Sequence, residues 1–137
     1  MQKLFYTLML CSFLLAGCEN NDLMQSDKKV REEIENKDWK RVAPSPNQDY
    51  KEIWHFSEGK GILYMVDDTL SFTYSIDSKF SSSYVTITGL PYPNTITGLE
   101  NVNLNLKWTV AEISDKVLYL SAATESGTIK SLEYVIQ

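Results

Sequence analysis

Few side chains of this 137-residue sequence have the types and spacing that catalysis or metal binding needs. His55 is the single histidine, and a metal site or a nucleophilic triad requires a cluster of partners around such a group. Asp67 and Asp68 form a carboxylate pair, but aspartate is a common turn residue and calcium requires roughly six to eight oxygen ligands. The sequence also has no Gly-x-Ser-x-Gly elbow and no glycine-rich phosphate loop. We therefore expect no catalytic residue, no metal site and no cofactor, and do not expect an enzyme.

One cysteine stands where its thiol could be modified. Lys3 precedes an almost wholly apolar run over residues 4–15, and small residues lead from there to Cys18. A basic head, an apolar run of about 7–15 residues and small residues at the cut are typical of a secretory signal peptide. Residues 15–18, Leu-Ala-Gly-Cys, resemble the lipobox of bacterial lipoproteins. The resemblance implies cleavage before Cys18 and a thioether-linked diacylglycerol on its sulfur.

The apolar run has two other interpretations. It is too short for a membrane span, which needs roughly 18–20 apolar residues. A core strand or helix is the remaining alternative, and the polar residues 19–22, Glu-Asn-Asn-Asp, argue against it. Each buried CH₂ of a lipid chain contributes about 0.8 kcal/mol, so two or more chains hold a protein stably. We expect a lipid-anchored protein of the cell envelope, in the outer membrane, on its periplasmic or surface face.

These expectations divide the chain into three parts. Residues 1–17 are the signal peptide, residues 18–26 are the lipidated cysteine with a flexible polar tether, and residues 27–137 are one domain. Cys11 leaves with the signal peptide and Cys18 carries lipid, so the domain must fold without a disulfide. Loss of Lys3 changes the net charge from −5 to −6. An acidic domain argues against a nucleic-acid partner and against charge-driven binding to anionic lipid headgroups.

A short helix is predicted from residue 27 to about residue 36. Ser26 and Asp27 suit its N-cap, because their side-chain oxygens can accept hydrogen bonds from free backbone N–H groups. Val30 and Ile34 are four residues apart and share one face, which we expect to pack against the domain. A helix of about three turns is marginal without such packing.

The rest of the domain has the period-two pattern of strands with one buried face. Residues 70–76 and 103–110 alternate cleanly between apolar and polar, and six further stretches do so less cleanly. Those six are residues 39–42, 50–56, 62–66, 84–88, 117–122 and 128–136. Short turns rich in Gly, Asp and Ser separate most of them. We therefore predict an all-β domain, a small eight-stranded antiparallel up-and-down barrel, with a β-sandwich as the alternative.

Three segments of the domain resemble a known family. They are residues 52–61 (EIWHFSEGKG), residues 70–76 (LSFTYSI) and residues 107–114 with 116–120 (KWTVAEIS, KVLYL). They are similar to the second strand and turn, a middle strand and the late hairpin of bacterial, Bacteroidetes-type lipocalin-like lipoproteins. The resemblance implies a lipocalin-like barrel on a lipid anchor, with Trp39 as a plug at its base.

The long segment over residues 89–101 is the main candidate for a binding lid. Loops beyond about 12 residues tend to be functional or disordered. Pro91 and Pro93 stiffen this one, while Tyr92, Ile96 and Leu99 could cap the barrel mouth or contact a ligand. The alternative is an ordered flap that packs its apolar groups over the barrel end.

The interior of the barrel decides between two functions. An eight-stranded barrel is just wide enough to be filled by side chains or to hold one small ligand. Aromatic residues such as Trp54 and Trp108 would line a cavity in the second case and fill a core in the first. The expected function is binding of a small apolar or amphipathic ligand in a hollow barrel, and a filled barrel is the alternative. A filled one would be a non-enzymatic interaction or structural protein that docks an envelope protein or a glycan.

Overall fold

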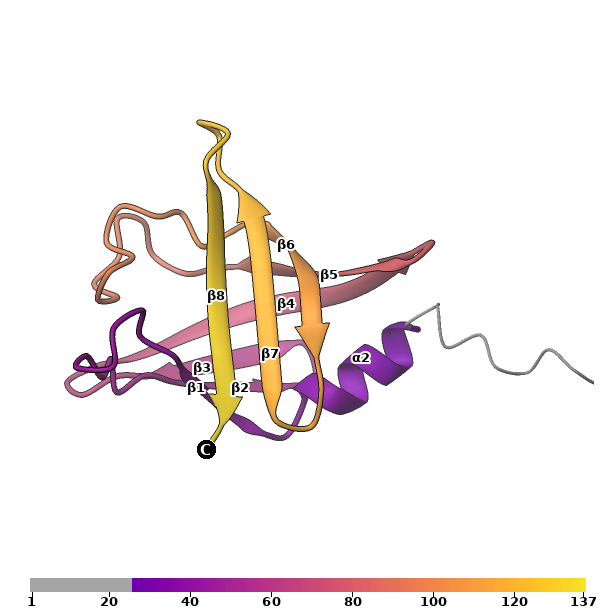
Figure 1. Ribbon diagram of the computed structural model, residues 1–137, viewed down its shortest axis with the longest axis horizontal. Coiled ribbons are helices and arrows are strands. Elements are labelled where there is room, and N and C mark those ends of the chain that lie inside the picture. The colour runs from indigo at the N-terminus through magenta and orange to yellow at the C-terminus, as the bar shows by residue number, and fades with distance from the viewer. Residues whose placement is uncertain (1–25) are drawn as a thin grey trace, which may run out of the picture.

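The computed structural model describes residues 26–137, which form one short helix and eight strands (Figure 1). The elements are α2 Asp27–Ile34, β1 Asp38–Arg41, β2 Ile53–Ser57, β3 Lys60–Tyr64, β4 Thr69–Lys79, β5 Ser82–Thr88, β6 Lys107–Ile113, β7 Val117–Ala123 and β8 Ile129–Ile136. The expected signal peptide, Cys18 and the tether up to residue 25 lie outside the described residues. Among the described residues, no helix has the length and apolar character that crossing a membrane requires.

The eight strands form a closed antiparallel barrel in sequence order. Each strand pairs with the next along the chain, and β1 pairs with β8 through Trp39 opposite Ile136 and Arg41 opposite Tyr134. Closure pairs the edges that an open sheet would leave exposed. The predicted up-and-down barrel is therefore confirmed, and the β-sandwich alternative is wrong.

Two strands begin three or four residues later than the sequence pattern predicts. β6 begins at Lys107 rather than at 103, yet Leu104 is buried in the preceding connection and its carbonyl accepts a hydrogen bond from Trp108 Nε1, at 3.1 Å. Leu104 is thus an apolar residue buried in a loop, and its position made the alternating pattern of β6 appear to begin before the strand does. β2 begins at Ile53 rather than at 50, because Lys51 has a positive φ of 52°, which extended strands do not adopt.

Helix α2 begins as predicted and ends earlier. The Ser26 hydroxyl accepts a hydrogen bond from the backbone N–H of Lys29, at 3.2 Å, and so caps the first turn. The helix ends at Ile34 rather than at 36, because Glu35 is extended and Asn36 has a φ of 60°. Val30 and Ile34 are fully buried, as the sequence predicts.

The barrel has two differently built ends. At the helix end, α2 packs mainly against β4 and β6, and the turns at residues 58–59, 80–81 and 114–116 lie at this end. The Trp39 indole donates a hydrogen bond to the carbonyl of Ile34, at 2.9 Å, so Trp39 and α2 together close this end. The opposite end, which we call the flap end, carries the connections over residues 42–52, 65–68, 89–106 and 124–128. In Figure 1 the flap-end loops lie to the left and top, and the helix-end turns lie to the right and bottom.

Candidate functional site

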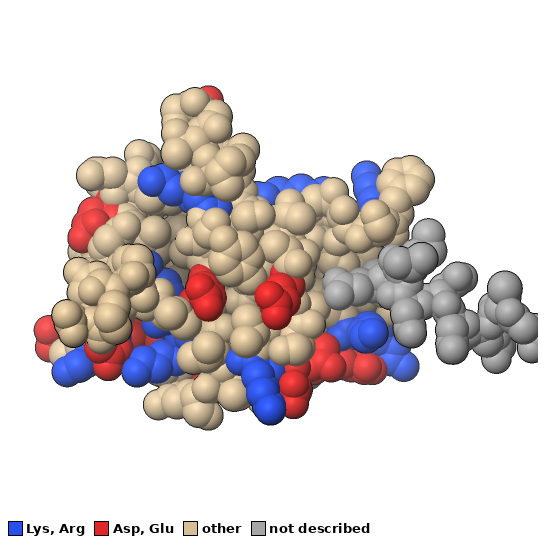
Figure 2. Space-filling model, in the orientation of Figure 1, with Lys and Arg blue, Asp and Glu red and all other residues tan. Residues whose placement is uncertain are grey.

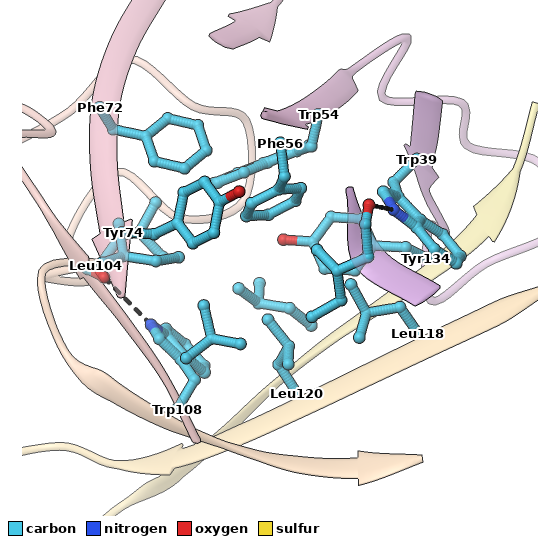
Figure 3. Close-up of a cluster of buried hydrophobic side chains, with 14 of the residues drawn as sticks. Trp39, Trp54, Phe56, Phe72, Tyr74, Leu104, Trp108, Leu118, Leu120 and Tyr134 are labelled. Carbon is cyan, nitrogen blue, oxygen red and sulfur yellow. Dashed lines mark hydrogen bonds between the residues drawn. The ribbon is translucent and has the colours of Figure 1, made fainter. Parts of the chain in front are cut away.

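Aromatic rings fill the centre of the barrel. Trp54 lies between Phe72 and Tyr134, with ring centroids 5.4 and 5.6 Å away, and Phe56 meets Phe72 and Tyr74 edge-on at 5.4 and 5.1 Å. Figure 3 shows these rings converging from several strands, with Trp108, Leu118 and Leu120 below them. Trp54 and Trp108 are fully buried. The two tryptophans singled out as ligand-contacting residues are therefore parts of this core.

Residues 89–106, which we call the flap, cover the flap end of the barrel. Ile96 is fully buried, Leu99 is 7% exposed and Leu104 is 1% exposed. The Asn94 side chain holds them in place: its NH₂ donates to the carbonyls of Leu99 and Val102, and its oxygen accepts from the Ile96 N–H, all at 2.9 Å. The predicted lid residues Ile96 and Leu99 thus point into the protein.

A buried ion pair ties the flap to the first two strands. Arg41 Nε donates to Glu52 Oε2 at 2.7 Å, and Arg41 Nη2 also binds both Glu52 and the carbonyl of Thr97 in the flap. The guanidinium lies over the ring of Tyr50, 3.7 Å from its centroid. This pair was not predicted from the sequence, although Arg41 occupies an inward position on β1, two residues after Trp39.

Burial dominates the electrostatics of this cluster. Removal of Glu52 from water raises the pKa of its carboxyl group, against the opposing effect of the Arg41 hydrogen bond and charge. Burial likewise raises the pKa of the Tyr134 hydroxyl well above its ordinary value. That hydroxyl has no hydrogen-bond partner among the described residues. Arg41 and Glu52 are 5% and 1% exposed, so their arrangement fastens the flap and offers no open reactive group.

Of the residues first considered for chemistry, His55 lies apart from this cluster, whereas Asp67 and Asp68 line one hollow together with Glu52. His55 Nδ1 is 2.8 Å from Asp38 Oδ1 on the outer face of the barrel. Asp68 lies in the β3–β4 turn, where its carbonyl accepts from the Met65 N–H at 2.9 Å. Within residues 26–137 no three His, Cys, Asp or Glu side chains come together as a metal site.

Hollows are found outside the aromatic core. The flap groove, of about 520 Å³, lies between the flap and the β7–β8 turn. Its lining comprises Tyr92, Gly98, Glu100, Asn101, Val102, Asn103, Leu106, Thr124, Glu125, Ser126, Thr128 and Lys130. The mouth hollow, of about 370 Å³, is lined by Tyr50, Glu52, Met65, Val66, Asp67, Asp68, Thr95 and Thr97. Two others have volumes of about 320 and 380 Å³, and the second reaches one ring of the aromatic core, that of Phe72, beside Gly61.

Tyr92 is the predicted lid residue that faces outward. Its side chain is 56% exposed and lines the flap groove. Glu100, also in the groove lining, accepts a hydrogen bond from the Gly98 N–H at 3.1 Å. Hydrogen bonds from its own backbone N–H and that of Gly98 lower the pKa of the Glu100 carboxyl. The groove therefore presents an aromatic ring beside a fixed carboxylate, amides and hydroxyls.

Charge on the surface is mixed. On the face in Figure 2, acidic and basic side chains are interspersed along the lower edge, and neither sign covers an extended area. Several lysines pair with neighbouring carboxylates, as in Lys37–Glu33 at 2.9 Å and Lys107–Asp77 at 3.2 Å. The flap groove likewise carries both signs of charge, with Glu100, Glu125 and Lys130 in its lining.

Comparisons with protein-family models, curated proteins and solved structures found no match for this chain.

Proposed function

We propose that this protein is a lipid-anchored, non-enzymatic binding protein of the cell envelope, whose filled barrel docks an envelope protein or glycan in the flap groove. The packing of the interior carries this proposal. Aromatic rings occupy the barrel centre, α2 closes one end and the flap closes the other. A partner is therefore bound on the outside. The closed eight-stranded barrel supports the resemblance to lipocalin-like envelope lipoproteins.

The composition of the flap groove fits a polar partner. Tyr92 offers a ring on which a sugar or an apolar side chain can stack, and Asn101 and Asn103 lie in the same lining. Exposed tyrosine combines an apolar face with a polar tip, which is why it is enriched at interfaces. A groove of about 520 Å³ is large enough for a peptide side-chain cluster or a short glycan.

The anchor is tested by following lipid on Cys18. Cells supplied with radiolabelled palmitate should label the wild-type protein, and Cys18→Ala should remain unlabelled and uncleaved. Wild-type protein without label would contradict the lipid-anchor part of the proposal.

The docking site is tested by photo-crosslinking in intact cells. A benzophenone amino acid at Tyr92 should give a reproducible adduct of fixed mass. Tyr64 is the matched control, since it is 44% exposed and lies outside the groove lining. Protease or glycosidase sensitivity of the adduct then identifies a protein or a glycan. Equal adducts at both positions, or none at Tyr92, would contradict the groove as the docking site.

A small ligand is the second candidate, and the mouth hollow favours it. Its volume of about 370 Å³ lies within the range of ligand pockets, and Met65 and Val66 give it an apolar side. A small amphipathic molecule there would lie against the flap rather than inside the barrel. Native mass spectrometry of the protein purified from its own cells should then show a bound mass that Val66→Asp abolishes. A ligand-free spectrum would contradict this candidate.

A further inference from the structure

One hairpin extends beyond the barrel wall. β4 pairs with β3 only as far as Thr73, and β5 pairs with β6 only from Tyr84 onward. Beyond those points the pairs Ser78–Ser83 and Lys79–Ser82 join β4 and β5 to each other. We call residues 77–83 the finger. Figure 1 shows it reaching out at the right, beyond the neighbouring strands.

Phe80 at the tip of the finger is unfavourable for folding. Its side chain is 87% exposed, so it contributes little to the core. Its φ of 56° lies in the left-handed region, where hairpin turns favour Gly, Asn or Asp, and a bulky residue there costs about 1–3 kcal/mol. A small polar residue at this position would suit the turn better and would not expose an apolar ring to water. Phe80 therefore points to a contact outside the domain.

The finger and the start of α2 lie on the same side of the barrel. β4 runs towards the helix end, and Ser26, the first described residue, begins α2 at that end. In Figure 1 both the finger and the start of α2 are directed to the right. The eight peptide steps from Cys18 to Ser26 span at most about 29 Å. Lipid on Cys18 would hold the helix end within that distance of a bilayer.

We propose that Phe80 inserts into the lipid–water interface of the membrane that holds Cys18, with Lys79 beside it. Aromatic rings prefer this interface, and a neighbouring lysine can extend its ammonium group to the headgroup phosphates. Lys79 is exposed and forms no ion pair within residues 26–137. The contact is apolar at its tip, so it does not depend on the net charge of the domain. The inference rests on the lipid anchor proposed above.

The test places a fluorophore on the finger of the lipidated protein. With Cys11 cleaved off and Cys18 acylated, Phe80→Cys supplies the one reactive thiol for an environment-sensitive dye. On vesicles of phosphatidylethanolamine and phosphatidylglycerol, emission should shift to shorter wavelength and be quenched by lipid-borne spin labels. Gln48→Cys is the control, since Gln48 is exposed in the connection over residues 42–52 at the flap end and lines none of the hollows described above, and its dye should report water.

A second form separates this inference from the anchor. Residues 1–18 are replaced by a histidine tag, and the protein is held on nickel-chelating lipid. A blue-shifted dye at position 80 in this form, together with failure of the natural chain to bind vesicles, would overturn the anchor and leave the finger contact standing. A dye at position 80 that reports water in both forms, as at position 48, would overturn the finger contact.

Discussion

Arg41 and Glu52 show how a charged pair can be kept inside an apolar barrel. Loss of one partner from a buried pair is costly because the remaining charge is uncompensated, whereas an apolar pair of similar volume is often neutral or stabilising. We predict that Arg41→Met lowers the free energy of unfolding by about 3 kcal/mol, and that Arg41→Met with Glu52→Leu recovers most of it. Urea unfolding of the three proteins measures both effects. A double variant as unstable as the single one would show that the guanidinium contributes mainly through Tyr50 and Thr97.

The same carboxyl group predicts a pH dependence. Burial raises the pKa of Glu52 in the folded protein above its ordinary value of 4.5. The folded state therefore binds the proton more tightly, and stability contributed by Glu52 is present below pH 4.5 and is lost as pH rises through the folded pKa. Glu52→Gln cannot titrate, so it should gain in stability relative to the wild type over that window. Urea unfolding at a series of pH values measures the difference, and a constant difference would contradict the raised pKa.

Gly61 is a position where the core requires the absence of a side chain. It lies opposite Phe72 in the β3–β4 register, and a Cβ there would overlap the Phe72 ring. We predict that Gly61→Ala destabilises the protein by about 1–3 kcal/mol through overpacking. In a Phe72→Leu background the same substitution should cost less, since the ring is gone. Additive effects of the two changes in a double-mutant cycle would show that the ring is not the cause.

At the scale of elements, the Asn94 side chain is a central support of the flap. Asn94 is 6% exposed and makes three hydrogen bonds within the flap. We predict that Asn94→Ala costs about 2 kcal/mol or more, because buried carbonyls of Leu99 and Val102 lose their donor. Amide hydrogen exchange should accelerate over residues 94–102 and remain slow in β7. Uniform acceleration across the barrel would show instead that the flap and barrel unfold together.

The strands were predictable from sequence where one face is buried and the other is exposed to solvent. Period-two alternation is then a direct consequence of the fold, as in residues 70–76. The pattern failed at Leu104, which is buried although it lies in a loop. It also failed at Lys51, because its positive φ interrupts the extended backbone and the polarity of side chains does not reveal such a backbone conformation.

The candidate site was less predictable because closure of the barrel builds it. The flap groove joins residues 92–106 to residues 124–130, and the Arg41 contact to Thr97 spans 56 positions. Local patterns carry no information on such pairs. Tyr92 and the lid segment could be singled out by length and proline content alone, whereas the lining from the β7–β8 turn could not.

At the scale of the whole molecule, the two ends of the barrel divide the proposed tasks. The helix end carries the finger and the start of α2, and the flap end carries Tyr92 and the groove. A membrane at the helix end therefore leaves the groove directed away from lipid, where a partner can reach it. In this arrangement the membrane would hold the barrel at its helix end while the groove at the flap end remains open to a partner.

The proposed orientation of the barrel on the membrane gives a prediction that is tested with cysteine variants of the full-length, lipidated protein. On intact vesicles, Tyr92→Cys should react with a bulky maleimide as fast as it does in detergent, because the flap end faces water. Phe80→Cys should react more slowly on vesicles than in detergent, because lipid covers the finger. The ratio of the two rates for each variant removes differences in intrinsic thiol reactivity. Slowing at position 92 with no change at position 80 would mean that the barrel lies the other way up, with its groove against the membrane.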